Sequence, residues 1–224
     1  MRHELKYLIS APSAKILKSL LGAVLRPDPH YPDGSYSVCS LYFDDISLSA
    51  YHEKLDGTPV REKFRIRLYN SDTSHIVLEK KYKKNELVNK NSFLLNKKQA
   101  YAIIDGDNIH DGDPLAKEFT AKRISCGLKP SVTVKYDRTA FVFPAENTRI
   151  TVDENIRFSR SPSSLFDENA PFVLLPSESK TVIEVKFDSA FPSFLSPILS
   201  TVAAERTAYS KYAMAVGAVV DFGG

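Results

Sequence analysis

Residues 61–69, which read REKFRIRLY, decide the fold class. Successive side chains of a strand point to opposite faces, so Phe64, Ile66 and Leu68 share one face. Same-face neighbours lie about 6.6 Å apart, and a row of cations at that spacing repels itself unless an anion lies along it. The alternation therefore predicts a strand with one buried apolar face and one cationic face, the latter carrying Arg61, Lys63, Arg65 and Arg67.

The same two-faced pattern recurs in other predicted strands. Charged pairs share a face at Glu4 and Lys6, Glu79 and Lys81, Arg149 and Asp153, and Glu184 and Lys186. An open sheet with water on its charged side accounts for this pattern. A sheet that curls around its charged face, with helices outside, accounts for it as well. The second arrangement buries many charges and so requires an anionic ligand, with a metal, to match them.

We expect the α+β class, with a closed antiparallel β-barrel and helices packed outside it. Residues 1–224 are expected to form a single domain. Helices are predicted after Ser10 to about residue 25, over 44–55, over 97–126 with a break at 106–114, and over most of 191–217. Residues 159–179 are predicted to be a loop. Strands are predicted over 4–9, 36–43, 60–69, 75–83, 88–95, 132–143, 149–158 and 181–188.

Composition excludes several classes of protein. The chain has 224 residues, a net charge of +3 and only two cysteines, too few for a disulfide framework. It has no run of 18 apolar residues and no apolar signal core, so a cytoplasmic protein is expected. The phosphate-binding motifs G-x-x-x-x-G-K-[ST] and G-x-G-x-x-G are absent. The aromatic residues fall mainly on the apolar faces, which argues against stacking of nucleic-acid bases.

Seven short motifs in order give a more specific indication. They are RHELKY (2–7), SLYFD (40–44), KFRIR (63–67), LEKK (78–81), KYDR (135–138), IEVK (183–186) and YSKY (209–212). The set resembles the catalytic domain of the vacuolar transporter chaperone (VTC) polyphosphate polymerases in its bacterial form. That family belongs to the triphosphate tunnel metalloenzymes, or CYTH superfamily. The resemblance covers nearly the whole chain.

The resemblance implies a tunnel of eight antiparallel strands and transfer of the γ-phosphate of ATP to a growing polyphosphate chain. It implies a divalent metal, Mn or Mg, held by Glu184. Glu79 and Asp153 are weaker candidates for the metal and are expected rather to orient cations. ATP and polyphosphate are the expected partners, with no nucleic acid and with a membrane protein as a further option at the inner face of the membrane. Residues expected to act in catalysis are Lys6, Arg65, Arg67, Lys81, Arg138 and Lys211. Residues expected to bind substrate are Lys63, Tyr136, Arg149, Lys186 and Ser210.

Two other functions stay open. A triphosphatase would use the same residues to release phosphate to water, and a non-enzymatic polyanion or RNA binder would use an exposed basic sheet. The acidic Glu-x-Glu-x-Lys start of hydrolytic tunnel enzymes appears here only as Glu4-x-Lys6, which favours a transferase. Lys211 and Ser210 are expected on a helix at the tunnel mouth, with Lys211 exposed enough to contribute little to stability.

Overall fold

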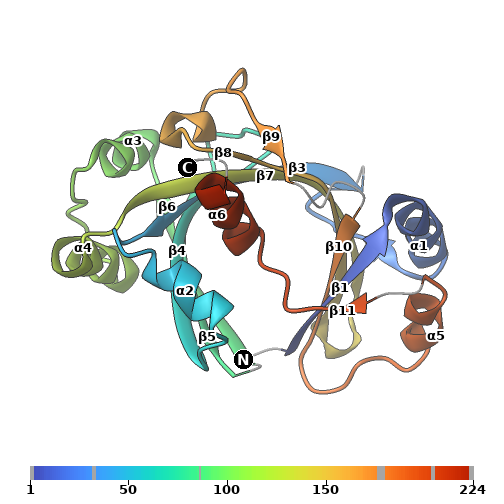
Figure 1. The fold of residues 1–224 in the computed structure, drawn as a ribbon. Helices are drawn as coiled ribbons and strands as arrows, with labels where there is room; N and C mark the ends of the chain where they lie inside the picture. Colours follow the sequence, from blue (N-terminus) through green and yellow to red (C-terminus); the bar gives the residue numbers. More distant parts are fainter. Residues whose placement is uncertain (1–2, 32–33, 86, 176–179, 203–204, 222–224) are drawn as a thin grey trace.

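The computed structural model describes residues 3–31, 34–85, 87–175, 180–202 and 205–221. One antiparallel sheet dominates the fold, and Figure 1 shows it as an arch around a central space. Its eight long strands confirm the predicted number. In sheet order they are β1 (His3–Ser10), β10 (Lys180–Phe187), β8 (Thr148–Ser159), β7 (Lys129–Phe143), β3 (Ser35–Asp44), β4 (Val60–Tyr69), β5 (Ile76–Lys84) and β6 (Leu87–Leu95).

The convex face of the arch is covered by four helices in two groups. On one side, α3 (Lys97–Asp105) and α4 (Pro114–Cys126) pack on the apolar face of β4. Phe64, Ile66 and Leu68 are all at most 3% exposed there, as the alternation predicts. On the other side, α1 (Ala11–Val24) and α5 (Leu195–Ser200) pack on β8 and β10. The predicted cap of α1 is confirmed, because the Ser10 side chain accepts a hydrogen bond from the Ser13 N–H.

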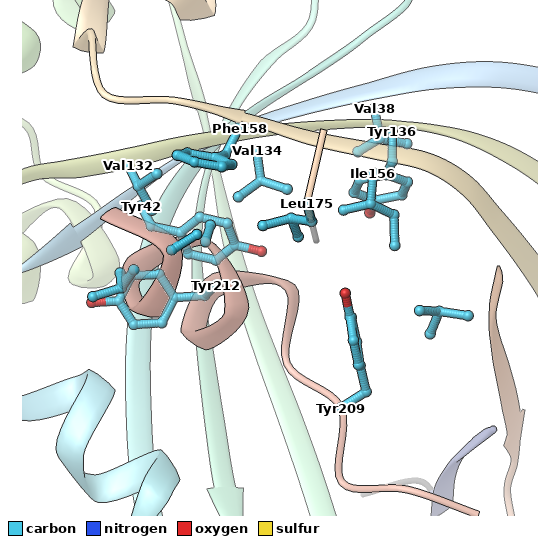
Figure 2. Close-up of a cluster of buried hydrophobic side chains, with 14 of the residues drawn as sticks. Val38, Tyr42, Val132, Val134, Tyr136, Ile156, Phe158, Leu175, Tyr209 and Tyr212 are labelled. Carbon is cyan, nitrogen blue, oxygen red and sulfur yellow. The ribbon is translucent and has the colours of Figure 1, made fainter. Parts of the chain in front are cut away.

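The C-terminal helix α6 (Lys211–Asp221) lies on the concave side of the sheet, which corrects the expectation that all helices pack outside (Figure 1). The cause is the composition of β3 and β7. Their concave faces carry apolar residues where β4 carries cations, and this patch requires an apolar cover. Figure 2 shows Tyr212 of α6 and the preceding Tyr209 among these side chains, which include Val38, Tyr42, Val132, Val134 and Tyr136. The shorter helix α2 (Ser49–Leu55) packs beside α6.

The prediction that 191–217 is mostly helical is wrong. Between α5 and α6 the chain forms a short strand, β11 (Glu205–Arg206), that pairs with β1. The Thr207 N–H donates to the Lys6 carbonyl at 2.9 Å, so this backbone satisfies its hydrogen bonds in the sheet and not in a helix. Ser210 then starts α6, because its Oγ accepts from the Ala213 N–H at 3.3 Å, as a serine N-cap does.

The barrel is not closed by backbone hydrogen bonds. Within the described part of the chain, β11 and β1 form one edge of the sheet and β6 the other, and the two edges are not paired. The strands β1 and β6 nevertheless contact each other. Glu4 of β1 accepts hydrogen bonds from the Lys81 ammonium of β5 at 2.7 and 2.9 Å. A closed barrel would join these two edges by backbone hydrogen bonds. Here a side-chain ion pair spans the seam between them instead.

Short elements replace parts of the predicted loops. They are β2 (Arg26–Pro27), the 3-10 turns η1 (Ala145–Asn147) and η2 (Pro162–Leu165), and β9 (Val173–Leu174). Arg2 of the first motif and residues 176–179 of the predicted 159–179 loop lie outside the described residues.

Candidate functional site

A cavity of about 170 Å³ lies on the concave face of the sheet. Eleven basic side chains and two acidic ones line it, so its charge is strongly positive. The cations are Lys6, Lys54, Arg61, Lys63, Arg65, Arg67, Lys81, Lys83, Arg138, Lys186 and Lys211, and the carboxylates are Glu4 and Glu184. An excess of this size, partly buried, favours a polyanionic ligand, because the alternative is mutual repulsion in a poorly solvated space.

The two Glu-x-Lys pairs of β1 and β10 meet in opposite order. The antiparallel register places Glu4 opposite Lys186 and Lys6 opposite Glu184. The Lys6 Nζ lies 3.4 Å from Glu184 Oε1 and 3.5 Å from Glu4 Oε1, and the Lys186 Nζ lies 3.3 Å from Glu184 Oε2. Burial raises the pKa of both carboxyl groups, but the lysines around them outweigh burial and hold each pKa well below its usual range. Both glutamates are therefore ionised.

The two central arginines of β4 are held from behind by Glu79 of β5, which is 1% exposed. The Arg65 Nε donates to Glu79 Oε2 at 2.7 Å, and Arg67 Nη1 lies 3.6 Å from the same oxygen. Arg67 also donates to Ser40 Oγ at 3.0 Å, and Arg65 to the Tyr42 hydroxyl at 3.2 Å. These contacts fix both guanidinium groups before any ligand arrives, which is the geometry that bidentate phosphate contacts need.

A second buried carboxylate orients the cations of β7 and α6. Asp153 of β8 is 0% exposed and accepts two hydrogen bonds from Arg138, at 2.6 and 2.7 Å. The Lys211 Nζ lies 2.6 Å from Asp153 Oδ2 and 3.4 Å from Glu184 Oε1. Burial lowers the pKa of Lys211, yet the two carboxylates outweigh it and raise that pKa. Lys211 is only 7% exposed, so the expectation of an exposed lysine is wrong.

Four cavity lysines, Lys54, Lys63, Lys81 and Lys186, have the opposite balance, because burial lowers the pKa of each. Burial, with help from Lys6 among other cations, lowers the pKa of Lys81 to about 8, although Glu4 opposes this. Burial and the surrounding cations hold the pKa of Lys63 well below its usual range. The Lys63 Nζ donates to Ser210 Oγ at 3.1 Å. An anion in the cavity would raise the pKa of Lys63 and of Lys81, whereas carboxylates already raise that of Lys211.

Four tyrosines also line the cavity, although the sequence argument placed the aromatic residues away from the cations. They are Tyr42, Tyr136, Tyr209 and Tyr212. Cations cover several of their rings: the Lys211 Nζ lies 4.7 Å from the Tyr136 ring centre, and the Lys63 Nζ lies 4.9 Å from that of Tyr212. These rings therefore stabilise cations and do not offer free faces for base stacking.

The structure brings together all the predicted site residues except one. Arg149 is not among the residues that line the cavity. Its Nη2 lies 2.5 Å from the Asp28 Oδ2 and donates to the Tyr36 hydroxyl at 2.8 Å. Asp28 is 3% exposed, and this buried carboxylate draws Arg149 into an ion pair of its own.

The sequence prediction left Glu4 out of the site. It expected Glu79 and Asp153 to orient cations, which the structure shows, but it did not name their partners. A signal for Glu4 was present: two Glu-x-Lys pairs on adjacent antiparallel strands oppose acid to base at both positions. No such signal marks Glu79 or Asp153, because their partners lie on other strands or on a helix distant in sequence.

The carboxylates fit a metal only as part of a larger ligand set. The described part of the chain holds no cluster of three or more His, Cys, Asp or Glu side chains suited to a metal. Glu4 and Glu184, however, both contact Lys6 and Lys186 and so face the same point of the cavity. Mg²⁺ ordinarily binds one or two carboxylates, and substrate phosphates and water complete its ligand set. The residues thus fit a divalent ion that arrives with a polyphosphate.

The arched sheet around a cavity is a tunnel fold, and solved structures share it. A candidate adenylate cyclase from Bacillus halodurans superposes with a TM-score of 0.60 at 16% identity, over 94% of each chain. A candidate adenylyl cyclase from Hippeastrum, described as having a dominant triphosphatase activity, superposes with a TM-score of 0.54 at 14% identity. That match covers all of this chain and 96% of the other.

The chain belongs to the VTC domain family, whose sequence model matches residues 1–220. A curated relative is subunit 4 of the vacuolar transporter chaperone complex of Schizosaccharomyces pombe, 28% identical over 216 residues. The aligned region covers 79% of this chain but only 30% of that relative, so the chain spans about a third of its length. Among the described residues, no helix has the length and apolarity to cross a membrane.

Proposed function

We propose that this protein is a metal-dependent polyphosphate polymerase, which transfers the γ-phosphate of ATP to a growing polyphosphate chain inside the cavity. The observation that carries the proposal is that eleven cations and only two carboxylates line one cavity. Family membership supports the same activity. A binding site for one small anion would not need cations from β1, β4, β5, β7, β10 and α6 at once.

In this proposal, Arg65 and Arg67 of β4 bind the triphosphate of ATP. Arg138 of β7 and Lys211 of α6 also contact phosphates. Glu79 and Asp153 keep these cations pointed into the cavity, so little reorganisation is needed as charge develops on the transferred group. Lys6, Lys63, Lys81 and Lys186 complete the positive lining, and Ser210 and Tyr136 add hydroxyl groups.

The transfer itself requires few groups from the protein. A terminal oxygen of the acceptor phosphate attacks the γ-phosphorus, the bond from that phosphorus to the β–γ bridging oxygen breaks, and ADP leaves. Positioning and charge stabilisation carry most of the catalysis in such reactions. A divalent ion held by Glu184, with Glu4 beside it, would supply neutralisation of phosphate charge.

The state of the two glutamates favours transfer to phosphate over transfer to water. An attacking water must lose a proton, whereas a terminal phosphate oxygen is already anionic. The lysines around Glu4 and Glu184 hold the pKa of each carboxyl group well below its usual range, which makes both poor bases. No described cavity residue is a histidine.

The test is product analysis of the purified protein with ATP and Mn²⁺. Polyphosphate appears as a ladder on a polyacrylamide gel, while ADP is measured in parallel. Arg65→Ala is the inactive comparison, and Lys98→Ala, which removes an exposed lysine of α3, is the matched control. If ADP forms without polymer, and free phosphate accounts for it, the polymerase assignment is wrong.

Triphosphate hydrolysis is the second candidate, supported by the description of the Hippeastrum protein as a triphosphatase on the same fold. The same assay separates the two functions by product. Attachment to a partner protein, and a cytoplasmic location, belong to the proposal as well, since the curated relative is a subunit of a complex. Co-purification of the chain with a membrane protein from its native cells would test this.

A further inference from the structure

The lysines of the cavity differ in whether a carboxylate neutralises them. Lys6, Lys81, Lys186 and Lys211 each have a Glu or Asp oxygen within 4.0 Å. In the part of the chain that the structure describes, Lys63 forms no such ion pair. Its ammonium group contacts only the Ser210 hydroxyl and, at 4.9 Å, the ring of Tyr212. Lys63 therefore lacks the carboxylate that favours the protonated form of these four lysines.

Cations approach Lys63 from β1, β4, β5 and α2. Lys81 faces it from β5, in direct register on the same face of the sheet. Lys6 of β1, Lys54 of α2 and Arg61 of its own strand add like charge. Ser210, just before α6, and Tyr212, within α6, contribute neutral groups. Burial, followed by these cations, holds the pKa of Lys63 well below its usual range.

We propose that Lys63 is a site of covalent modification by acyl phosphates. The reagent combines two groups that the cavity treats differently. Its phosphate binds the arginines, and its carbonyl carbon is then presented to an amine on the same strand that no described carboxylate keeps protonated. Arg61 and Arg65, each two residues from Lys63 on the same face of β4, are the nearest such anchors in sequence. An electrophile held beside a nucleophile reacts at a greatly increased effective concentration.

The step balances without a further reagent. The Lys63 Nζ lone pair attacks the acyl carbon, the bond from that carbon to the phosphate oxygen breaks, and phosphate leaves with the electron pair. The amine loses one proton, which the departing phosphate or water accepts. The product is an amide, which cannot be protonated and is larger than the amine. Modification would therefore prevent protonation of Lys63 and obstruct the triphosphate site.

The experiment incubates the full chain with acetyl phosphate at pH 7.5 and follows acetylation of each lysine by mass spectrometry. We expect Lys63 to react at least about tenfold faster than Lys98, an exposed lysine outside the cavity. Saturating tripolyphosphate should suppress acetylation of Lys63 and leave Lys98 unchanged. Equal rates at the two lysines, or no protection by tripolyphosphate, would overturn the proposal.

A second reagent separates chemistry from folding and from the polymerase proposal. Lys63→Arg cannot be acylated at this position and should keep the acetylation rate of Lys98. Acetic anhydride, which carries no phosphate, should favour Lys63 less than acetyl phosphate does. An equal preference with both reagents would show that phosphate binding plays no part. A protein that makes no polymer but shows protected acetylation at Lys63 would disprove the polymerase and leave this inference standing.

Discussion

The Lys211 ammonium lies 2.6 Å from Oδ2 of Asp153, a carboxylate that the fold buries completely. This contact fixes the first turn of α6 against β8 and aims a cation into the cavity. The same Asp153 also holds Arg138, so one acid orients two of the proposed phosphate contacts. Stability and function are therefore coupled at this position, which the sequence alone did not indicate.

Lys211→Ala should lower both stability and activity. Removing one partner of a buried ion pair leaves Asp153 with less compensation, which costs about 3 kcal/mol of unfolding free energy. Urea denaturation measures this, with Lys98→Ala as the control for loss of an exposed lysine. An unfolding free energy within about 0.5 kcal/mol of the parent, the range typical of surface substitutions, would contradict the buried pair.

Arg65→Ala should reduce the rate of polymer formation about a hundredfold, the scale of removing one oriented donor to the transition state. Arg67→Ala should do the same. Arg65→Lys keeps the charge but loses the planar group that meets both Glu79 and a phosphate, so it should recover only part of the rate. Parental activity in a folded Arg65→Ala protein would remove this strand from the site.

Glu184→Gln should raise the Mn²⁺ concentration needed for half-maximal activity by about tenfold or more, because the change keeps the shape and removes a ligand charge. Glu79→Gln is the informative comparison. Glu79 contacts Arg65, Arg67 and Lys90, so its loss should lower the rate without shifting the metal requirement. A metal requirement that is the same in Glu184→Gln and the parent would exclude Glu184 as the ligand.

The affinity for tripolyphosphate should fall as pH rises through about 8, where Lys81 loses its proton in the free protein. The sign for stability is opposite. Since the folded pKa of Lys81 lies below its ordinary value of 10.5, the unfolded chain binds more protons between these values, and this group's contribution to stability rises with pH. Calorimetric titration across pH 7 to 9.5 measures the first effect.

Lys81→Arg is the control for that titration. Arginine stays charged throughout the range, so the variant should lose less affinity than the parent between pH 7.5 and 9. Identical pH profiles for the two proteins would assign the proton to another group.

Much of the fold follows from alternation along the strands. Residues 61–69 divide into an apolar and a cationic face, and the structure places these faces on the outside and in the cavity. The position of α6 could not be read in this way. Its residues are apolar on several sides, and only the apolar concave faces of β3 and β7 show that it belongs inside the arch.

The candidate site was predictable in its cations and less so in its acids. A row of cations such as Arg65 and Arg67 can be recognised from the alternating spacing within one strand. The partners Glu79 and Asp153 act across strands and depend on register, which a single sequence does not give. Arg149 illustrates the same limit: its face was predicted, but Asp28, 121 positions earlier in the chain, draws it into a separate ion pair.

At the seam between β1 and β6, no backbone hydrogen bonds fix the distance between the two edges of the described sheet. Elsewhere, widening the arch would break a ladder of backbone hydrogen bonds, whereas here it parts the Glu4–Lys81 contact and the packing around it. A phosphate that takes the place of Glu4 on Lys81 preserves the charge balance as the edges separate. We therefore expect the two edges to separate without local unfolding when a hydrated polyphosphate binds. They should separate more easily as ionic strength weakens the ion pair.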